Sequence, residues 1–184
     1  MKVTNAAECY SRPVVILHWL SLILLIAVYS FIELRELFPK GTEIRELMKT
    51  MHYMLGLTVL LTVIPRMFFR LSSHTPAILP VPGRISQRLA QAMHLVLYLL
   101  MIGMPIAGWL MLSAAGKPIP FYGLELPPLV TENKELADSI KDVHKTIGNI
   151  GYFLIAAHAL AGLYHHYVQR DNTLSRILPT KSGQ

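Results

Sequence analysis

The sequence contains little cysteine and little charge. Its one cysteine, Cys9, excludes a disulfide within the chain and a metal cluster held by several thiolates of one chain. Charged residues make up 15% of the 184 residues and hydrophobic residues 53%, a balance too apolar for an ordinary soluble domain. We therefore predict a membrane protein, with a lipid bilayer and no nucleic acid among its partners.

Four apolar runs are long enough to form membrane-spanning helices. They cover residues 14–32, 51–69, 92–112 and 143–168, and at about 1.5 Å per residue each can cross a hydrocarbon core about 30 Å thick. The first run has no small-residue cleavage site after it, which indicates a retained helix and not a cleaved signal peptide. The predicted fold class is all-α, an integral membrane four-helix bundle forming a single domain over residues 1–184.

The charges at the two ends of the bundle indicate its orientation. The 17 Lys and Arg residues divide nine to eight, with nine on the side that carries both termini. Because Lys and Arg are enriched on the cytoplasmic side of membrane proteins, we expect a multi-pass protein with both termini in the cytoplasm.

Histidines inside the predicted membrane segments are the main candidates for a functional site, because ionisable groups in a membrane usually face the bundle interior. His144 and His158 are 14 residues apart, so they lie within about 40° of one another around one helix and about 21 Å apart along it. His18 lies near the cytoplasmic end of the first helix, and His52 near the opposite end of the second. We predict two pairs, His52 with His144 and His18 with His158, each binding one b-type haem iron. The haems are expected to be noncovalent, because the C-x-x-C-H attachment sequence is missing.

Other interpretations of these histidines remain open. They can be hydrogen-bonded residues of the bundle core, or a proton relay in a haem-free transporter. A zinc site fits less well, because the histidines do not converge at one depth and no carboxylate or thiolate accompanies them. Small residues near the histidines suit a porphyrin but also suit plain helix packing; they are Gly56, Gly148, Gly151 and Gly162.

Several segments resemble the bacterial cytochrome b561 family, most closely its superoxide oxidase branch. They are ILHW at His18, MHYMLG at His52, RLAQAMHLVLYLL at His94, DVHKTIGNIGYF at His144, and AAHALAGLYHHYVQRDNTLSRILP at the carboxyl end. The resemblance implies a four-helix protein of the bacterial inner membrane with two b-type haems. It implies an oxidoreductase that takes electrons from superoxide at the periplasmic face and passes them to ubiquinone, producing oxygen and quinol. It also implies the four haem ligands His18, His52, His144 and His158.

Cations on the periplasmic side are candidates for attracting superoxide, because a positive surface raises the local concentration of a small anion. The candidates are Arg35, Lys40 and Lys117. The alternative is that these are ordinary solvated loop charges.

His165 is the candidate quinone residue. It lies 7 residues beyond His158, on the same helix face and about 10 Å closer to the cytoplasm. It can hydrogen-bond a quinone carbonyl and deliver protons, since histidine titrates near neutrality. His94 is a further candidate for cofactor binding. The alternative for His94, His165 and the neighbouring His166 is anchoring at the membrane interface.

A different electron donor is also compatible with the sequence. The chain can be a membrane-anchor cytochrome that relays electrons between quinone and a partner redox subunit. Both interpretations require haem, whereas the transporter interpretation does not.

Overall fold

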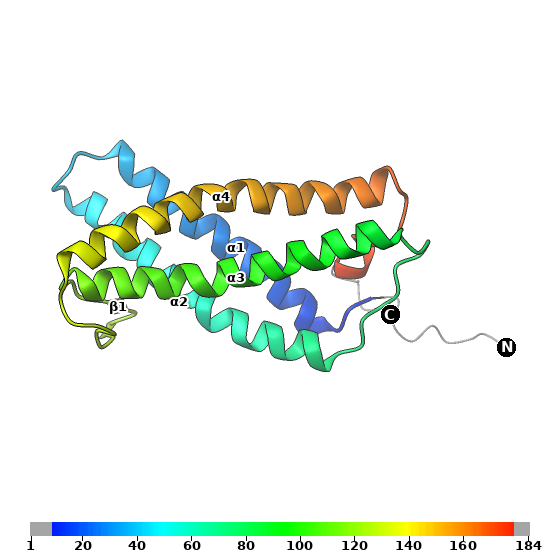
Figure 1. Ribbon diagram of the computed structural model, residues 1–184, viewed down its shortest axis with the longest axis horizontal. Coiled ribbons are helices and arrows are strands. Elements are labelled where there is room, and N and C mark those ends of the chain that lie inside the picture. Colours follow the sequence, from blue (N-terminus) through cyan, green and yellow to red (C-terminus); the bar gives the residue numbers. More distant parts are fainter. Residues whose placement is uncertain (1–8, 179–184) are drawn as a thin grey trace.

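The computed structural model describes residues 9–178 and contains four long helices (Figure 1). The helices are α1 (Arg12–Leu34), α2 (Glu43–Ser72), α3 (Arg84–Ala114) and α4 (Lys134–Tyr167). Two short 3₁₀ helices, η1 (Arg35–Leu37) and η2 (Ser175–Ile177), and two short strands, β1 (Pro120–Phe121) and β2 (Leu124–Glu125), complete the described elements. All four long helices have the length and apolar composition needed to cross a membrane. The predicted all-α membrane bundle is confirmed.

Each long helix extends beyond the apolar run from which it was predicted. Hydropathy marks the part of a helix that meets lipid, while the polar turns at its ends are helical as well. Arg66, which falls inside the predicted run, and Arg70, which follows that run by one residue, both lie inside α2. The start of α4 is stabilised by Asn133, whose side chain accepts a hydrogen bond from the backbone N–H of Leu136.

The first and last described residues lie at the same end of the bundle, together with the connection between α2 and α3 (Figure 1). We call this the terminal end. The backbone N–H of Tyr10 donates to the carbonyl of Arg176 (3.0 Å), and Trp19 Nε1 donates to the carbonyl of Ile177 (2.9 Å). These bonds hold the segment after α4 against the start of α1.

The opposite end carries the turn between α1 and α2 and the β1–β2 hairpin, and we call it the hairpin end (Figure 1). Tyr122 and Gly123 form the two-residue hairpin turn with positive φ values of 49° and 87°, as the tight turns of hairpins require. Just before the hairpin, Ile119 is buried against Leu57 of α2 and Leu112 of α3. The hairpin therefore covers this end of α2 and α3.

One buried apolar cluster is shared by three of the helices. Leu24, Val59, Val63 and Met101 form it, from α1, α2 and α3. By contrast, large apolar side chains point outward, such as Phe153 of α4, which is 77% exposed. Apolar side chains on the outside are expected where lipid surrounds a protein.

Helices α1 and α4 approach one another through side chains. The hydroxyl of Tyr29 in α1 donates to the carbonyl of Gly148 in α4 (3.0 Å), and Tyr152 of α4 donates to Glu33 of α1 (2.8 Å). The helix pairs with extensive contact are instead α1 with α2, α2 with α3, and α3 with α4. The histidines of α4 therefore face the bundle interior without a closely packed α1 backbone opposite them.

Candidate functional site

Two pairs of histidines meet across the bundle, one near each end. His18 of α1 and His158 of α4 have ring centres 6.4 Å apart, and His52 of α2 and His144 of α4 also have ring centres 6.4 Å apart. Two imidazoles that bind one metal from opposite sides have ring centres about 6 Å apart, since each metal–nitrogen bond is about 2 Å. The structure thus brings together the pairs expected from the sequence, at a separation that fits an iron between them.

The ring of His52 in the hairpin-end pair is held by a hydrogen bond to the backbone of α1. Its Nδ1 lies 2.9 Å from the carbonyl of Val28, to which only a protonated Nδ1 can donate. The proton on Nδ1 leaves Nε2 free to bind a metal, and such a bond also fixes the ring orientation. The Nδ1 of His144 is buried and has no hydrogen-bond partner among residues 9–178.

His18 of the terminal-end pair has a different neighbour. The guanidinium of Arg66 lies 3.0 Å from His18 Nδ1 and, being a donor only, donates to that nitrogen. Arg66 is half-buried within a membrane helix, where an unpaired cation is costly. The sequence analysis did not select Arg66, although a cation inside an apolar run is a recognisable pattern.

Three of the four paired histidines are followed by glycine one helical turn later, a regularity that the sequence analysis overlooked. The glycines are Gly56 after His52, Gly148 after His144 and Gly162 after His158. Residues four apart lie on the same helix face, and a Cβ added at Gly56 or Gly162 would meet nothing within 4 Å. At Gly148 it would meet only the flexible end of Met104. The spacing leaves space beside each pair for a flat macrocycle.

His94 of α3 lies against the terminal-end pair. Its ring centre is 5.5 Å from that of His158, and the two rings are nearly perpendicular. His166 is not part of this group: its Nδ1 is buried without a partner among the described residues, and its ring packs on Tyr167. Of His94 and His166, His94 is therefore the one close to a predicted haem ligand.

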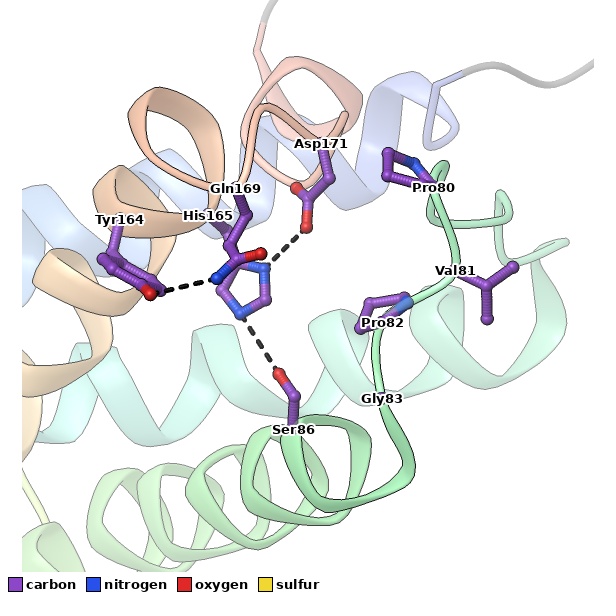
Figure 2. A pocket seen from close by; sticks show the side chains of 9 residues that line it. All are labelled: Pro80, Val81, Pro82, Gly83, Ser86, Tyr164, His165, Gln169 and Asp171. Carbon is purple, nitrogen blue, oxygen red and sulfur yellow. Dashed lines mark hydrogen bonds and ion pairs between the residues drawn. The ribbon is translucent and has the colours of Figure 1, made fainter.

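His165 lines a pocket of about 330 Å³ at the terminal end, between the start of α3 and the end of α4 (Figure 2). Its Nδ1–H donates to Asp171 Oδ2 (2.6 Å), and its Nε2 lies 3.3 Å from the hydroxyl of Ser86. The lining combines apolar and polar groups, from Pro80, Val81, Pro82, Gly83, Ser86, Tyr164, His165, Gln169 and Asp171. The pocket thus suits a ring that carries hydrogen-bond acceptors.

Asp171 fixes the orientation of His165 and was not identified from the sequence. It is only 6% exposed, and its other oxygen accepts the backbone N–H of Thr173 (2.8 Å). Burial by itself would raise the pKa of Asp171, but the hydrogen bonds from His165 and Thr173 outweigh it and hold the pKa below the ordinary 3.8. Asp171 is therefore ionised at neutral pH and keeps the Nδ1 proton of His165 directed at its own carboxylate.

The three predicted superoxide-attracting cations all lie at the hairpin end but differ in their surroundings. Arg35 forms an ion pair with the adjacent Glu36 (2.9 Å), which offsets part of its charge. Lys40 and Lys117 are exposed, and neither pairs with an acid of the described chain. Arg45 is buried and donates to the backbone carbonyls of the α1–α2 turn, so its role is structural.

Comparisons with known proteins identify the family. The sequence profile of the prokaryotic cytochrome b561 family matches residues 9–180. The chain is 39% identical to "Cytochrome b561 homolog 1" of Escherichia coli (strain K12) over 172 residues, covering 94% of this chain and 98% of that protein. It is 40% identical to "Probable superoxide oxidase CybB" of Yersinia pestis over 174 residues, covering 95% and 98% respectively. A second Escherichia coli protein, "Cytochrome b561 homolog 2", is 28% identical over 191 residues, covering 100% and 98%. The four membrane helices and the histidine pairs thus belong to a b-type cytochrome, and the chain is a member of the prokaryotic cytochrome b561 family.

Proposed function

We propose that this cytochrome takes electrons from superoxide at the hairpin end and passes them through two b-type haems to ubiquinone at the terminal end. The observation that carries the proposal is the presence of two histidine pairs, one near each end of the bundle, with a polar pocket beyond the second pair. This arrangement supports electron transfer across the membrane. We place the protein in the bacterial inner membrane, with the terminal end and both termini in the cytoplasm, because the Lys and Arg distribution favours that orientation.

The histidine pairs are the proposed haem ligands. His52 and His144 would hold one haem, and His18 and His158 the other. A haem held by each pair would supply reversible one-electron chemistry. The glycines one turn beyond these histidines give the macrocycles space.

Superoxide as the electron donor is supported by the hairpin-end cations and by the name of the Yersinia pestis relative. Lys40 and Lys117 form no ion pair with a described acid, and Arg35 lies at the same end of the bundle. Such charges speed the arrival of a small anion. Each superoxide gives up one electron and leaves as neutral O₂, which these cations do not retain.

Quinone reduction is proposed for the pocket at His165. Converting one quinone to quinol takes two electrons, supplied by two superoxide anions, and two protons. The Nε2 of His165 faces Ser86 at the pocket, and when the ring carries a proton on each nitrogen it can donate a hydrogen bond to a quinone carbonyl, while Asp171 accepts the Nδ1 proton and holds the ring in place. His165 is thus the proposed quinone residue. His94 is a proposed cofactor contact because its ring lies beside His158.

The test is to mix the purified haem-loaded protein with a superoxide-generating system and follow haem absorption. We expect rapid haem reduction that slows as salt is added, followed by reoxidation when ubiquinone is present. Superoxide dismutase should abolish the reduction. If the haems stay oxidised with superoxide but become reduced by a co-purified soluble redox subunit, the proposal fails and the membrane-anchor interpretation takes its place.

A further inference from the structure

Arg66 is a half-buried cation within a membrane-spanning helix that forms no ion pair with an acid of residues 9–178. Its guanidinium contacts His18 Nδ1 at 3.0 Å and Met101 Sδ at 3.8 Å, and it lies 5.4 Å from the centre of the Tyr98 ring. None of these groups carries a carboxylate. A cation within a membrane segment normally pairs with an acceptor of opposite charge, so Arg66 needs a partner that the described protein does not provide.

Neighbouring residues do not supply that partner. Among residues 9–178, Asp171 is the acid at the terminal end, and both of its oxygens are engaged by His165 and Thr173. The nearby Arg70 differs from Arg66, since it donates to Thr75 (2.6 Å) and lies over the ring of Tyr10. Arg176 also lies over Tyr10 and donates to the carbonyl of Pro76. Arg66 thus remains without a carboxylate acceptor among the described residues, and its neighbours are His18, Met101 and the phenol of Tyr98.

The contact between Arg66 and His18 cannot persist if His18 binds a haem iron. When His18 binds through Nε2, its proton sits on Nδ1, and two donors then face each other. When it binds through Nδ1, the iron takes the lone pair that Arg66 now uses. Either way the guanidinium is released, whereas the bond of His52 to Val28 is retained on binding through Nε2.

A b-type haem brings its own acceptors, because two propionate carboxylates extend from one edge of the macrocycle. Arginine is well suited to a carboxylate, since its planar guanidinium can make two parallel hydrogen bonds. Arg66 is also at the right depth. It lies six residues before the end of α2, and His18 lies six residues after the start of α1, which places both about 9 Å from the terminal end.

We infer that Arg66 binds a propionate of the haem held by His18 and His158, and thereby raises the reduction potential of that haem above the value it would otherwise have. The guanidinium offsets the propionate charge and stabilises the added electron. Among described residues the hairpin-end pair has no equivalent buried cation at hydrogen-bond distance from either histidine ring. The electron is therefore favoured on the terminal-end haem. The inference rests on the proposed pairing of His18 with His158, but not on superoxide as the donor.

The test is a redox titration of the haem-loaded protein in a His52→Ala background, which should retain only the terminal-end haem. We expect Arg66→Gln to lower the midpoint potential of this haem by at least 59 mV, which corresponds to a tenfold change in the equilibrium constant for one-electron reduction. Arg66→Lys, which keeps the charge, should lower it less. Arg88→Gln, an exposed cation on α3 near the same end, is the matched control and should leave the midpoint unchanged. A midpoint that does not move in Arg66→Gln would overturn the inference.

A binding measurement keeps the inference testable even if Arg66→Gln loads haem poorly. Apo protein is titrated with haem and with haem dimethyl ester, whose propionates are neutral. At the terminal-end site, wild-type protein should bind the ester at least tenfold more weakly than haem. The difference between ester and haem should be smaller in Arg66→Lys, which keeps the charge, and smallest in Arg66→Gln. An equal difference in all three proteins contradicts the inference. If His18→Ala keeps both haems, the pairing of His18 with His158 is itself refuted.

Discussion

Replacing Asp171 with asparagine should slow quinone reduction without affecting the acceptance of electrons. Asp171 accepts the Nδ1 proton of His165 at 2.6 Å and the Thr173 amide at 2.8 Å, and is only 6% exposed. A hydrogen bond to a charged group contributes about 1.5–3 kcal/mol. If the variant loses about 1.4 kcal/mol of this contribution in the transition state, because His165 is no longer held in its orientation, the rate of quinone reduction falls about tenfold.

Stopped-flow absorption separates the two half-reactions. Haem reduction by superoxide is followed without quinone, and reoxidation of the reduced haems is then followed with ubiquinone. We expect Asp171→Asn to slow the second step about tenfold at saturating quinone and to leave the first unchanged. Asp138→Asn, an exposed carboxylate near the start of α4, is the control and should match wild type in both. Equal slowing of both steps, or of neither, would refute the role given to Asp171.

Three further predictions concern stability, haem space and charge. Because the native pKa of Asp171 is depressed, its carboxylate stabilises the fold above the ordinary pKa of 3.8 and loses that effect as pH falls through the native value. Asp171→Asn should therefore melt below wild type at pH 7, with the gap shrinking below about pH 4; a constant gap in thermal denaturation contradicts this. Gly162→Leu should lower the haem content measured by pyridine haemochrome, whereas Gly103→Leu, an exposed glycine of α3, should not; equal haem content in both would argue against the space assigned beside His158. Changing Lys40 and Lys117 together to glutamine should slow haem reduction by superoxide several-fold and weaken its salt dependence; an unchanged rate at low salt would remove both residues from the proposed approach.

The parts of the structure that depend on periodicity were predictable. Four apolar runs long enough to cross a membrane predicted four helices, and counting helical turns placed His144 and His158 on one face at two depths. Because successive helices run in opposite directions, His52 was then assigned to the depth of His144 and His18 to the depth of His158. These inferences need only the helix rise, the angle per residue and the direction of each helix.

The parts that depend on tertiary contacts were not predictable. Asp171 follows α4 in a loop, and only the folding of that loop back toward the helix end brings its carboxylate to His165. Arg66 lies inside the apolar run predicted for the second helix, but its contact with His18 depends on how α1 packs against α2. The glycine one turn after His52, His144 and His158 was visible in the sequence, but its meaning depends on what lies beside each glycine.

Haem stoichiometry in two single variants tests the central claim most directly. Protein-bound haem is measured per chain by pyridine haemochrome, with reduced-minus-oxidised spectra, in wild type, His18→Ala and His52→Ala. The account predicts two b-type haems in wild type and one in each variant, with different spectra for the two remaining haems. A wild-type protein with one haem, or variants that keep both, would contradict it.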